Sequence, residues 1–223
     1  MVIRFLKVTH QHANGRGVED VSFALERGDF ALLAGHTGAG KTTILRLIYL
    51  DLLPQSGQVM IEGKFRHAVN PHERALLRRK MGIVFPESRL LPDRTIFENV
   101  ALPLRISGES SHRVHLLANR MLYRFGLQKR VNSRPGELSS GEQKKAALAR
   151  ALVVRPFILL ADEPLTNIDA QAGAEIVELL RQVNAEGTTI LAATHQPQAF
   201  DGVARFTLRL KEGRLASAGG GIL

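Results

Sequence analysis

The chain has 223 residues, of which 44% are hydrophobic, and it contains no cysteine. This length and apolar content suffice for the core of one large α/β domain, and the lack of cysteine excludes disulfides, thiolate metal sites and cysteine nucleophiles. The net charge of +9 favours contact with phosphates, nucleic acid or anionic lipid, but an aromatic content of 5% argues against a stacking platform for single-stranded nucleic acid.

The first half of the chain alternates short apolar runs with helical patterns. Residues 2–8 and 18–25 alternate apolar and polar side chains around a turn at residues 14–17, which predicts an antiparallel strand pair. The apolar run at 30–34 predicts a buried strand, and a glycine-rich turn follows it. The other elements predicted in this half are helices over 42–53 and 73–80 and strands over 58–61 and 82–85.

The middle of the chain is mainly helical. Helical patterns cover residues 95–100, 111–125 and 142–153, and Pro103 and Gly108 separate the first two. Residues 86–154 are therefore predicted to form a helical insertion.

Strand patterns return after the insertion. Apolar runs at 157–161 and 188–193 predict two strands, with a helix over 170–185 between them. Because strands and helices alternate outside the insertion, we predict an α/β fold with a mainly parallel core sheet.

One segment matches the phosphate-loop pattern in full, Gly35-His36-Thr37-Gly38-Ala39-Gly40-Lys41-Thr42. It lies between a predicted strand and a predicted helix, where phosphate binding requires it. Its glycines let successive backbone N–H groups point at phosphates, and the start of a helix favours negative charge. We expect Lys41 to contact the β- and γ-phosphates of a nucleotide and the Thr42 hydroxyl to bind Mg²⁺.

An acidic pair ends the strand predicted over 157–161. In parallel sheets ligands collect at the carboxyl ends of the strands, so Asp162 and Glu163 can face bound phosphates. Asp162 suits the Mg²⁺ shell, and Glu163 suits a general base that polarises the attacking water. By itself such a pair is as well suited to cap the next helix, but the phosphate loop upstream favours catalysis.

Two further features allow more than one interpretation. The segment Ser139-Ser140-Gly141-Glu142 opens a predicted helix and is either an anion-binding helix start or an ordinary N-cap. His195 directly follows the strand pattern at 188–193. A lone histidine in this position is more often structural than catalytic, yet it ends a strand of the same predicted sheet.

Together and in this order, these residues resemble the ATP-binding cassette (ABC) family of P-loop NTPases over nearly the whole chain. The resemblance implies catalytic roles for Glu163 and His195, and metal binding by Thr42 and Asp162. The nucleotide-binding residues that it implies are His12, Gly35, His36, Thr37, Gly38, Ala39, Gly40, Lys41, Thr42, Thr43, Ser139, Ser140, Gly141 and Glu142.

The resemblance also implies an organisation for the chain. Residues 1–223 are expected to form one ABC ATPase domain, in which 1–85 and 155–223 make a RecA-like core with an N-terminal antiparallel β part. Residues 86–154 are expected to form the helical subdomain. The implied cofactors are ATP and Mg²⁺, and the implied assembly is a homodimer with ATP at its interface. A physical reason is that the signature helix start of one subunit supplies donors to the γ-phosphate held by the other.

Finer details resemble the cell-division branch of the family. They are the histidine in the phosphate loop, the stretch from Leu90 to Val100, and the opening Ile3-Arg4-Phe5. This resemblance implies a separate, FtsX-like inner-membrane partner that controls cell-wall hydrolases. The N-terminus lacks a secretory signal and no run of about 18 apolar residues is present, so we expect peripheral attachment to the cytoplasmic face of the inner membrane through that partner.

Several other functions remain open at this point. One is a transporter ATPase of the lipoprotein-release or macrolide-export kind, and another is a nucleotide-gated assembly module with little turnover. A soluble ABC protein acting on DNA or ribosomes fits the basic charge, but the paired cassettes or long coiled-coil insertions typical of that class are missing. No direct contact with nucleic acid is therefore expected.

The chain departs from the family pattern at Pro86, at His12, at Ser140 in place of a glycine, and at Leu165-Thr166 in place of Thr-Gly. Pro86 stands where the family has a glutamine that touches the Mg²⁺ shell, and proline offers neither an amide side chain nor an N–H. We expect slow turnover, with Glu87 or water taking over part of the metal contact. His12 stands where an aromatic residue usually stacks on adenine, which predicts modest base selectivity.

Overall fold

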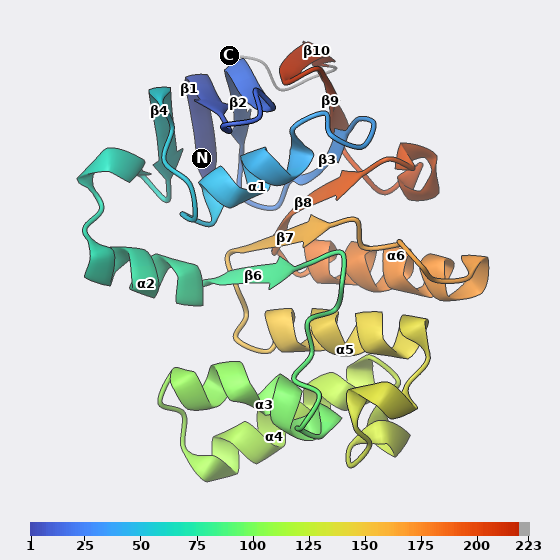
Figure 1. The fold of residues 1–223 in the computed structure, drawn as a ribbon. Coiled ribbons are helices and arrows are strands. Elements are labelled where there is room, and N and C mark those ends of the chain that lie inside the picture. Colours follow the sequence, from blue (N-terminus) through green and yellow to red (C-terminus); the bar gives the residue numbers. More distant parts are fainter. Residues whose placement is uncertain (219–223) are drawn as a thin grey trace.

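The computed structural model describes residues 1–218, so residues 219–223 of the expected domain lie outside the described part. The strands form two sheets, a four-stranded sheet in the order β2-β1-β4-β5 and a six-stranded sheet in the order β10-β9-β3-β8-β7-β6 (Figure 1). The strands are β1 Ile3–Gln11, β2 Gly17–Leu25, β3 Phe30–Ala34, β4 Ser56–Ile61, β5 Lys64–Phe65, β6 Met81–Val84, β7 Ile158–Asp162, β8 Thr189–Thr194, β9 Phe206–Lys211 and β10 Arg214–Ala218. The α-helices are α1 Lys41–Ile48, α2 Pro71–Arg79, α3 Ile96–Ile106, α4 Ser111–Arg124, α5 Ser140–Leu152 and α6 Ala170–Ala185.

The four-stranded sheet contains the predicted antiparallel pair. Ile3 of β1 lies opposite Leu25 of β2, and Phe5 lies opposite Phe23. The two phenylalanine rings are buried and stack with their centroids 4.6 Å apart. β4 pairs antiparallel with the other edge of β1. Burial of one face explains why the apolar residues alternate along β1 and β2.

The six-stranded sheet confirms the predicted parallel core. β9, β3, β8, β7 and β6 run parallel, and β10 pairs antiparallel with β9 at one edge. Every residue of β3, β7 and β8 is buried, as expected for strands that are covered on both faces. The carboxyl ends of these three strands lie at the same edge, which brings together the segments that follow them.

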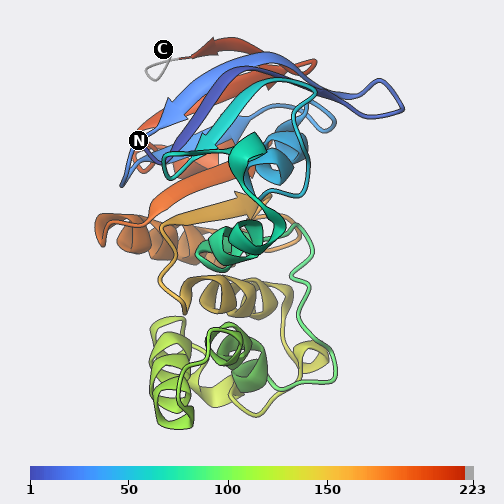
Figure 2. The same cartoon turned by 90° about the vertical axis from the view of Figure 1, so that its left-hand side faces the viewer.

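Helices cover both faces of the six-stranded sheet. α1 lies between the two sheets, and α5 and α6 lie on the opposite face, with α3 and α4 beyond α5 (Figures 1 and 2). One hydrophobic core joins α1, through Ile44 and Leu47, to the inner faces of both sheets. A second core joins the other face of the six-stranded sheet to α3, α4, α5 and α6. Among residues 1–218, no helix is both long and apolar enough to cross a bilayer.

Two helix predictions were wrong in their boundaries. The helix predicted over 42–53 ends at Ile48, because Leu50 has a φ of 67° and Arg78 donates hydrogen bonds to the carbonyls of Tyr49 and Leu50. Pro103 does not end a helix but lies inside α3. Burial of Leu104 against the second core continues that helix past the proline, which shows packing overriding local preference.

Two strands of the six-stranded sheet, β9 and β10, were not predicted. The sequence did carry a signal for β9, because apolar Leu208 and Leu210 alternate with charged Arg209 and Lys211. In the structure the two leucines are buried and the two charged residues are exposed.

Candidate functional site

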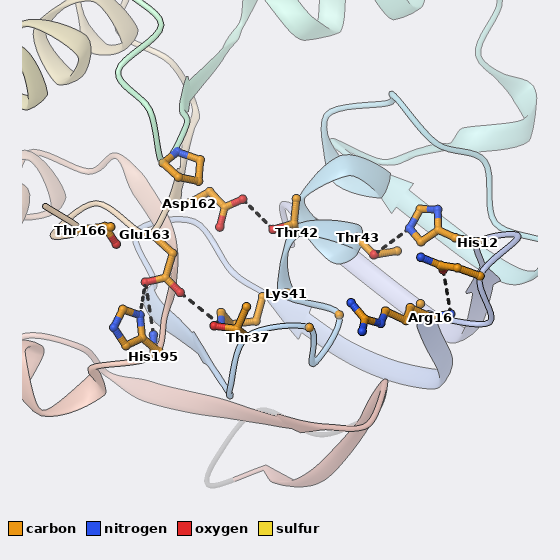
Figure 3. Close-up of a pocket in the computed structure, with 15 residues that line it drawn as sticks. His12, Arg16, Thr37, Lys41, Thr42, Thr43, Asp162, Glu163, Thr166 and His195 are labelled. Atoms are coloured by element: carbon orange, nitrogen blue, oxygen red, sulfur yellow. Dashed lines mark hydrogen bonds and ion pairs between the residues drawn. The ribbon is translucent and has the colours of Figure 1, made fainter.

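A cavity of about 460 Å³ opens at the carboxyl ends of β3, β7 and β8. Figure 3 shows the side chains of its wall, which come from segments far apart in the sequence. The lining residues are His12, Asn14, Arg16, Gly17, Thr37, Gly38, Gly40, Lys41, Thr42, Thr43, Pro86, Asp162, Glu163, Thr166 and His195. The structure therefore brings most of the predicted phosphate loop together with the acidic pair and His195.

The phosphate loop joins β3 to α1. Gly40 is the N-cap of α1 with a φ of 106°, and a Cβ atom there would lie 2.6 Å from the Gly17 carbonyl oxygen, so only glycine fits. The N-cap contributes no side-chain hydrogen bond, and the first turn of α1 contains no acidic residue. The N–H groups at this helix start are thus left for an anion in the cavity.

Glu163 lies between two groups that can carry positive charge. Its Oε1 atom is 3.2 Å from Lys41 Nζ, and its Oε2 atom is 2.8 Å from His195 Nδ1 (Figure 3). Lys41 also donates to the carbonyls of Gly35 and His36, at 2.7 and 3.2 Å. The φ of Glu163 is 47°, a conformation that costs a non-glycine residue about 1–3 kcal/mol. The fold thus holds this carboxylate in one place at the expense of local backbone strain.

Thr42 and Asp162 form a second contact across the cavity. Thr42 Oγ1 donates to Asp162 Oδ2 at 2.8 Å. Burial raises the pKa of Asp162, and the hydrogen bond from Thr42 opposes that rise. Two hard oxygen ligands beside a phosphate loop suit Mg²⁺, which usually takes one or two protein ligands together with nucleotide phosphates. Among residues 1–218, no group of three or more acidic or histidine side chains gathers to hold a metal ion.

The opposite end of the cavity is polar and is partly aromatic. His12 Nε2 lies 3.1 Å from Thr43 Oγ1, and the His10 ring packs edge-on against the His12 ring with centroids 5.0 Å apart. Asn14 and Arg16 line the same end. From the sequence these two residues were assigned only to a turn. Their position shortly after His12, a predicted binding residue, is the sequence signal that could have indicated a place in the cavity wall.

Thr166 and Pro86 also form part of the wall. Thr166 lines the cavity, and its Oγ1 atom is buried without a hydrogen-bond partner, so a polar ligand would satisfy it. Pro86 lines the cavity, but Glu87 does not; its side chain is 82% exposed and its carboxylate is 3.9 Å from Arg89. Glu87 instead lines a neighbouring cavity together with Thr42 and Asp162, and its expected contact with the metal stays a prediction.

Several predicted binding residues lie outside the lining. Gly35, His36 and Ala39 belong to the phosphate loop but not to the cavity wall. The four residues 139–142 lie at the start of α5, where Ser139 and Glu142 form a capping box. Glu142 Oε1 also accepts a hydrogen bond from Arg130 at 2.9 Å. Within one chain this segment thus has the N-cap role and contributes nothing to the cavity.

Comparison with known proteins gives consistent matches. A sequence model of the ABC transporter family matches residues 18–166. The cell division ATP-binding protein FtsE of Escherichia coli (strain K12) is 36% identical over 215 residues, which cover 96% of this chain and 97% of that protein. FtsE of Mycobacterium tuberculosis (strain ATCC 25618 / H37Rv) is 35% identical over 217 residues, covering 96% and 94%. The dimeric structure of MJ0796, a bacterial ABC transporter cassette, has a TM-score of 0.89 at 30% identity and covers 97% of both chains.

Proposed function

The chain belongs to the ABC transporter family, and on that basis we propose that it is the ATP-binding and ATP-hydrolysing subunit of an FtsE-type cell-division complex. The observation that carries this proposal is the cavity in which the phosphate loop, the Thr42–Asp162 contact and the Lys41–Glu163–His195 contacts meet. The identity of 32–36% to FtsE proteins over nearly the whole chain supports the assignment to cell division.

Each group in the cavity has a distinct role in this proposal. The N–H groups at the start of α1 and the Lys41 ammonium bind and orient the phosphates of ATP. Thr42 and Asp162 hold Mg²⁺, which neutralises charge on the β- and γ-phosphates when it is bound. Glu163 orients the attacking water and accepts its proton, and His195 fixes the Glu163 carboxylate. His12, a ring at the polar end of the cavity, lies against the base.

The assembly in this proposal is a homodimer with ATP between the subunits. Residues 139–142 lie outside the cavity of their own chain, which leaves the start of α5 for the ATP of a second copy. The dimeric structures of MJ0796, one of them bound to ADP and Pi, support this arrangement. Residues 86–154 form the helical subdomain between that interface and an FtsX-like inner-membrane partner, through which the subunit attaches to the cytoplasmic face of the membrane.

A Glu163→Gln variant tests the catalytic assignment. It keeps the size of the side chain but cannot accept the proton of water, so turnover should fall by about 10²–10⁴-fold while ATP with Mg²⁺ still binds and holds the protein as a dimer. Turnover is measured by phosphate release and dimer formation by light scattering. Undiminished phosphate release in this variant would remove Glu163 from the mechanism.

A nucleotide-gated assembly module with little turnover is a second candidate, and Pro86 in the cavity wall favours it. It predicts ATP-dependent dimerisation with negligible phosphate release in the unmodified protein. A lipoprotein-release or macrolide-export role is separated from cell division by identifying the membrane protein that co-purifies with the chain.

A further inference from the structure

The loop after β6, residues 85–94, is held by polar side chains of the helices. Figure 1 shows this segment running from β6 past α5 to α3. Lys144 of α5 donates from Nζ to the Pro86 carbonyl at 2.5 Å and lies 3.5 Å from the Phe85 carbonyl. Arg150, further along α5, donates to the carbonyls of Ser88 and Arg89 at 3.0 and 2.7 Å. We call these two cations and the four carbonyls the loop clamp.

Both cations of the loop clamp lack a carboxylate partner. The Lys144 residue is 2% exposed, and burial lowers the pKa of Lys144 and the pKa of Arg150. Among residues 1–218 neither forms an ion pair with Asp or Glu. A buried cation is costly unless its donors are satisfied, and here backbone carbonyls of one loop satisfy them. Separation of the loop from α5 would therefore leave unpaired charge and unpaired carbonyls together.

The far end of the loop is attached to a neighbouring helix. Asn99 of α3 is fully buried, accepts a hydrogen bond from the Leu91 N–H at 2.7 Å and donates to the Leu91 carbonyl at 3.1 Å. α3 in turn packs on α5 through the second hydrophobic core. The loop is thus fixed at successive points to α5 and α3, so its position depends on these helices.

The near end of the same loop forms part of the cavity wall. Pro86 lines the cavity with Thr42, Asp162 and Glu163. Because its ring is apolar and its nitrogen carries no hydrogen, the carbonyl is the one polar group that Pro86 offers, and Lys144 binds it. A displacement of α5 would consequently displace Pro86 beside the acidic pair.

We propose that Lys144 and Arg150 are positioning residues, which fix Pro86 in the wall of the nucleotide cavity and make the loop follow the movements of α5. Coupling between the cavity and the helices then passes through the backbone carbonyls of the loop. It does not require a side-chain amide at position 86, where this chain has proline. This inference rests on the proposed ATPase function, and it assigns to Lys144 a role distinct from that of its neighbour Lys145, which pairs with Glu175 at 2.5 Å.

The first test is steady-state ATP turnover of Lys144→Met, with Lys145→Met as the matched control. Loss of the clamp should lower kcat by about tenfold and leave the KM for ATP within about twofold, because the groups that bind ATP are untouched. Lys144→Arg, which keeps a cation, should restore kcat to within about threefold of the unmodified protein. Equal values of kcat for Lys144→Met and the unmodified protein, or equal losses in both Met variants, would overturn the proposal.

The second test uses no nucleotide. Arg150 holds the Arg89 carbonyl, which trypsin must reach to cleave after Arg89. Loosening of the loop should therefore speed this cleavage about tenfold or more in Lys144→Met, while Lys145→Met is cut at the unmodified rate. Arg150→Lys, which cannot form both hydrogen bonds, should change cleavage in the same direction and serves if Lys144→Met does not fold. An unchanged cleavage rate in the folded variants contradicts the clamp. If the unmodified protein releases no phosphate from ATP, the proposed function fails while this cleavage test still decides the clamp.

Discussion

Replacing Asp162 by Asn is expected to stabilise the nucleotide-free protein. The Asp162 residue is 6% exposed and its carboxylate accepts one side-chain hydrogen bond, from Thr42 at 2.8 Å. The two lysines whose charges act on Asp162 make their own contacts elsewhere, Lys41 with Glu163 and Lys144 with the Pro86 carbonyl. A buried carboxylate with so few partners opposes folding, and Asn keeps the acceptor without the charge. We expect the free energy of unfolding at neutral pH to rise by about 1–2 kcal/mol, or about 2–4 °C in Tm for each kcal/mol.

The effect should depend on pH in a defined direction. Burial raises the pKa of Asp162 above its value in the unfolded chain, so between these two pKa values the folded state binds more protons than the unfolded state. Stability of the unmodified protein then falls as pH rises through that window, and the charged carboxylate is destabilising above it. The advantage of the Asp162→Asn variant should therefore shrink as the pH is lowered into the acid range and the carboxyl becomes protonated.

The assay is urea unfolding followed by circular dichroism, in EDTA and without nucleotide, across a series of pH values. Asp201→Asn, which removes an exposed carboxylate, is the matched control and should change stability by less than about 0.5 kcal/mol. ATP with Mg²⁺ at a hundredfold excess over Kd should add about 2.7 kcal/mol to the unmodified protein and less to the variant. An Asp162→Asn protein that is less stable than its parent at neutral pH, or an advantage that does not vary with pH, would refute this reasoning.

Three further substitutions probe the cavity and the fold. Pro86→Gln restores a side-chain amide in the cavity wall and should raise ATP turnover, measured with and without the membrane partner; an unchanged rate in both conditions would show that Pro86 does not limit hydrolysis. His12→Ala should weaken ATP binding by about 1 kcal/mol, or about fivefold in Kd, through loss of a ring that packs beside the base; unaltered affinity in calorimetry would argue against stacking. Gly57→Ala should destabilise the fold by about 3 kcal/mol, because Gly57 has a φ of 76° and a Cβ atom would lie 2.2 Å from the Lys7 carbonyl oxygen; a thermal midpoint equal to that of the unmodified protein would contradict this.

The sequence by itself determined the core of the fold and the phosphate loop. Apolar runs such as Phe30–Ala34 are buried on both faces, so their composition alone identifies them as central strands. The phosphate loop is contiguous, and its glycines are required by backbone geometry that any similar strand–loop–helix shares. Such local rules need no knowledge of distant partners, and they placed Lys41 and Thr42 correctly at the start of the helix that follows the loop.

Tertiary structure alone decided which distant groups meet. The contacts of Thr42 with Asp162 and of Lys144 with Pro86 join residues 120 and 58 positions apart, and no periodicity encodes such pairs. The same holds for Glu87, which follows Pro86 in the sequence but points into solvent, and for Arg16, which lines the cavity from a turn. Side-chain direction in a loop depends on the surfaces that pack against it, and these exist only after the sheets and helices have assembled.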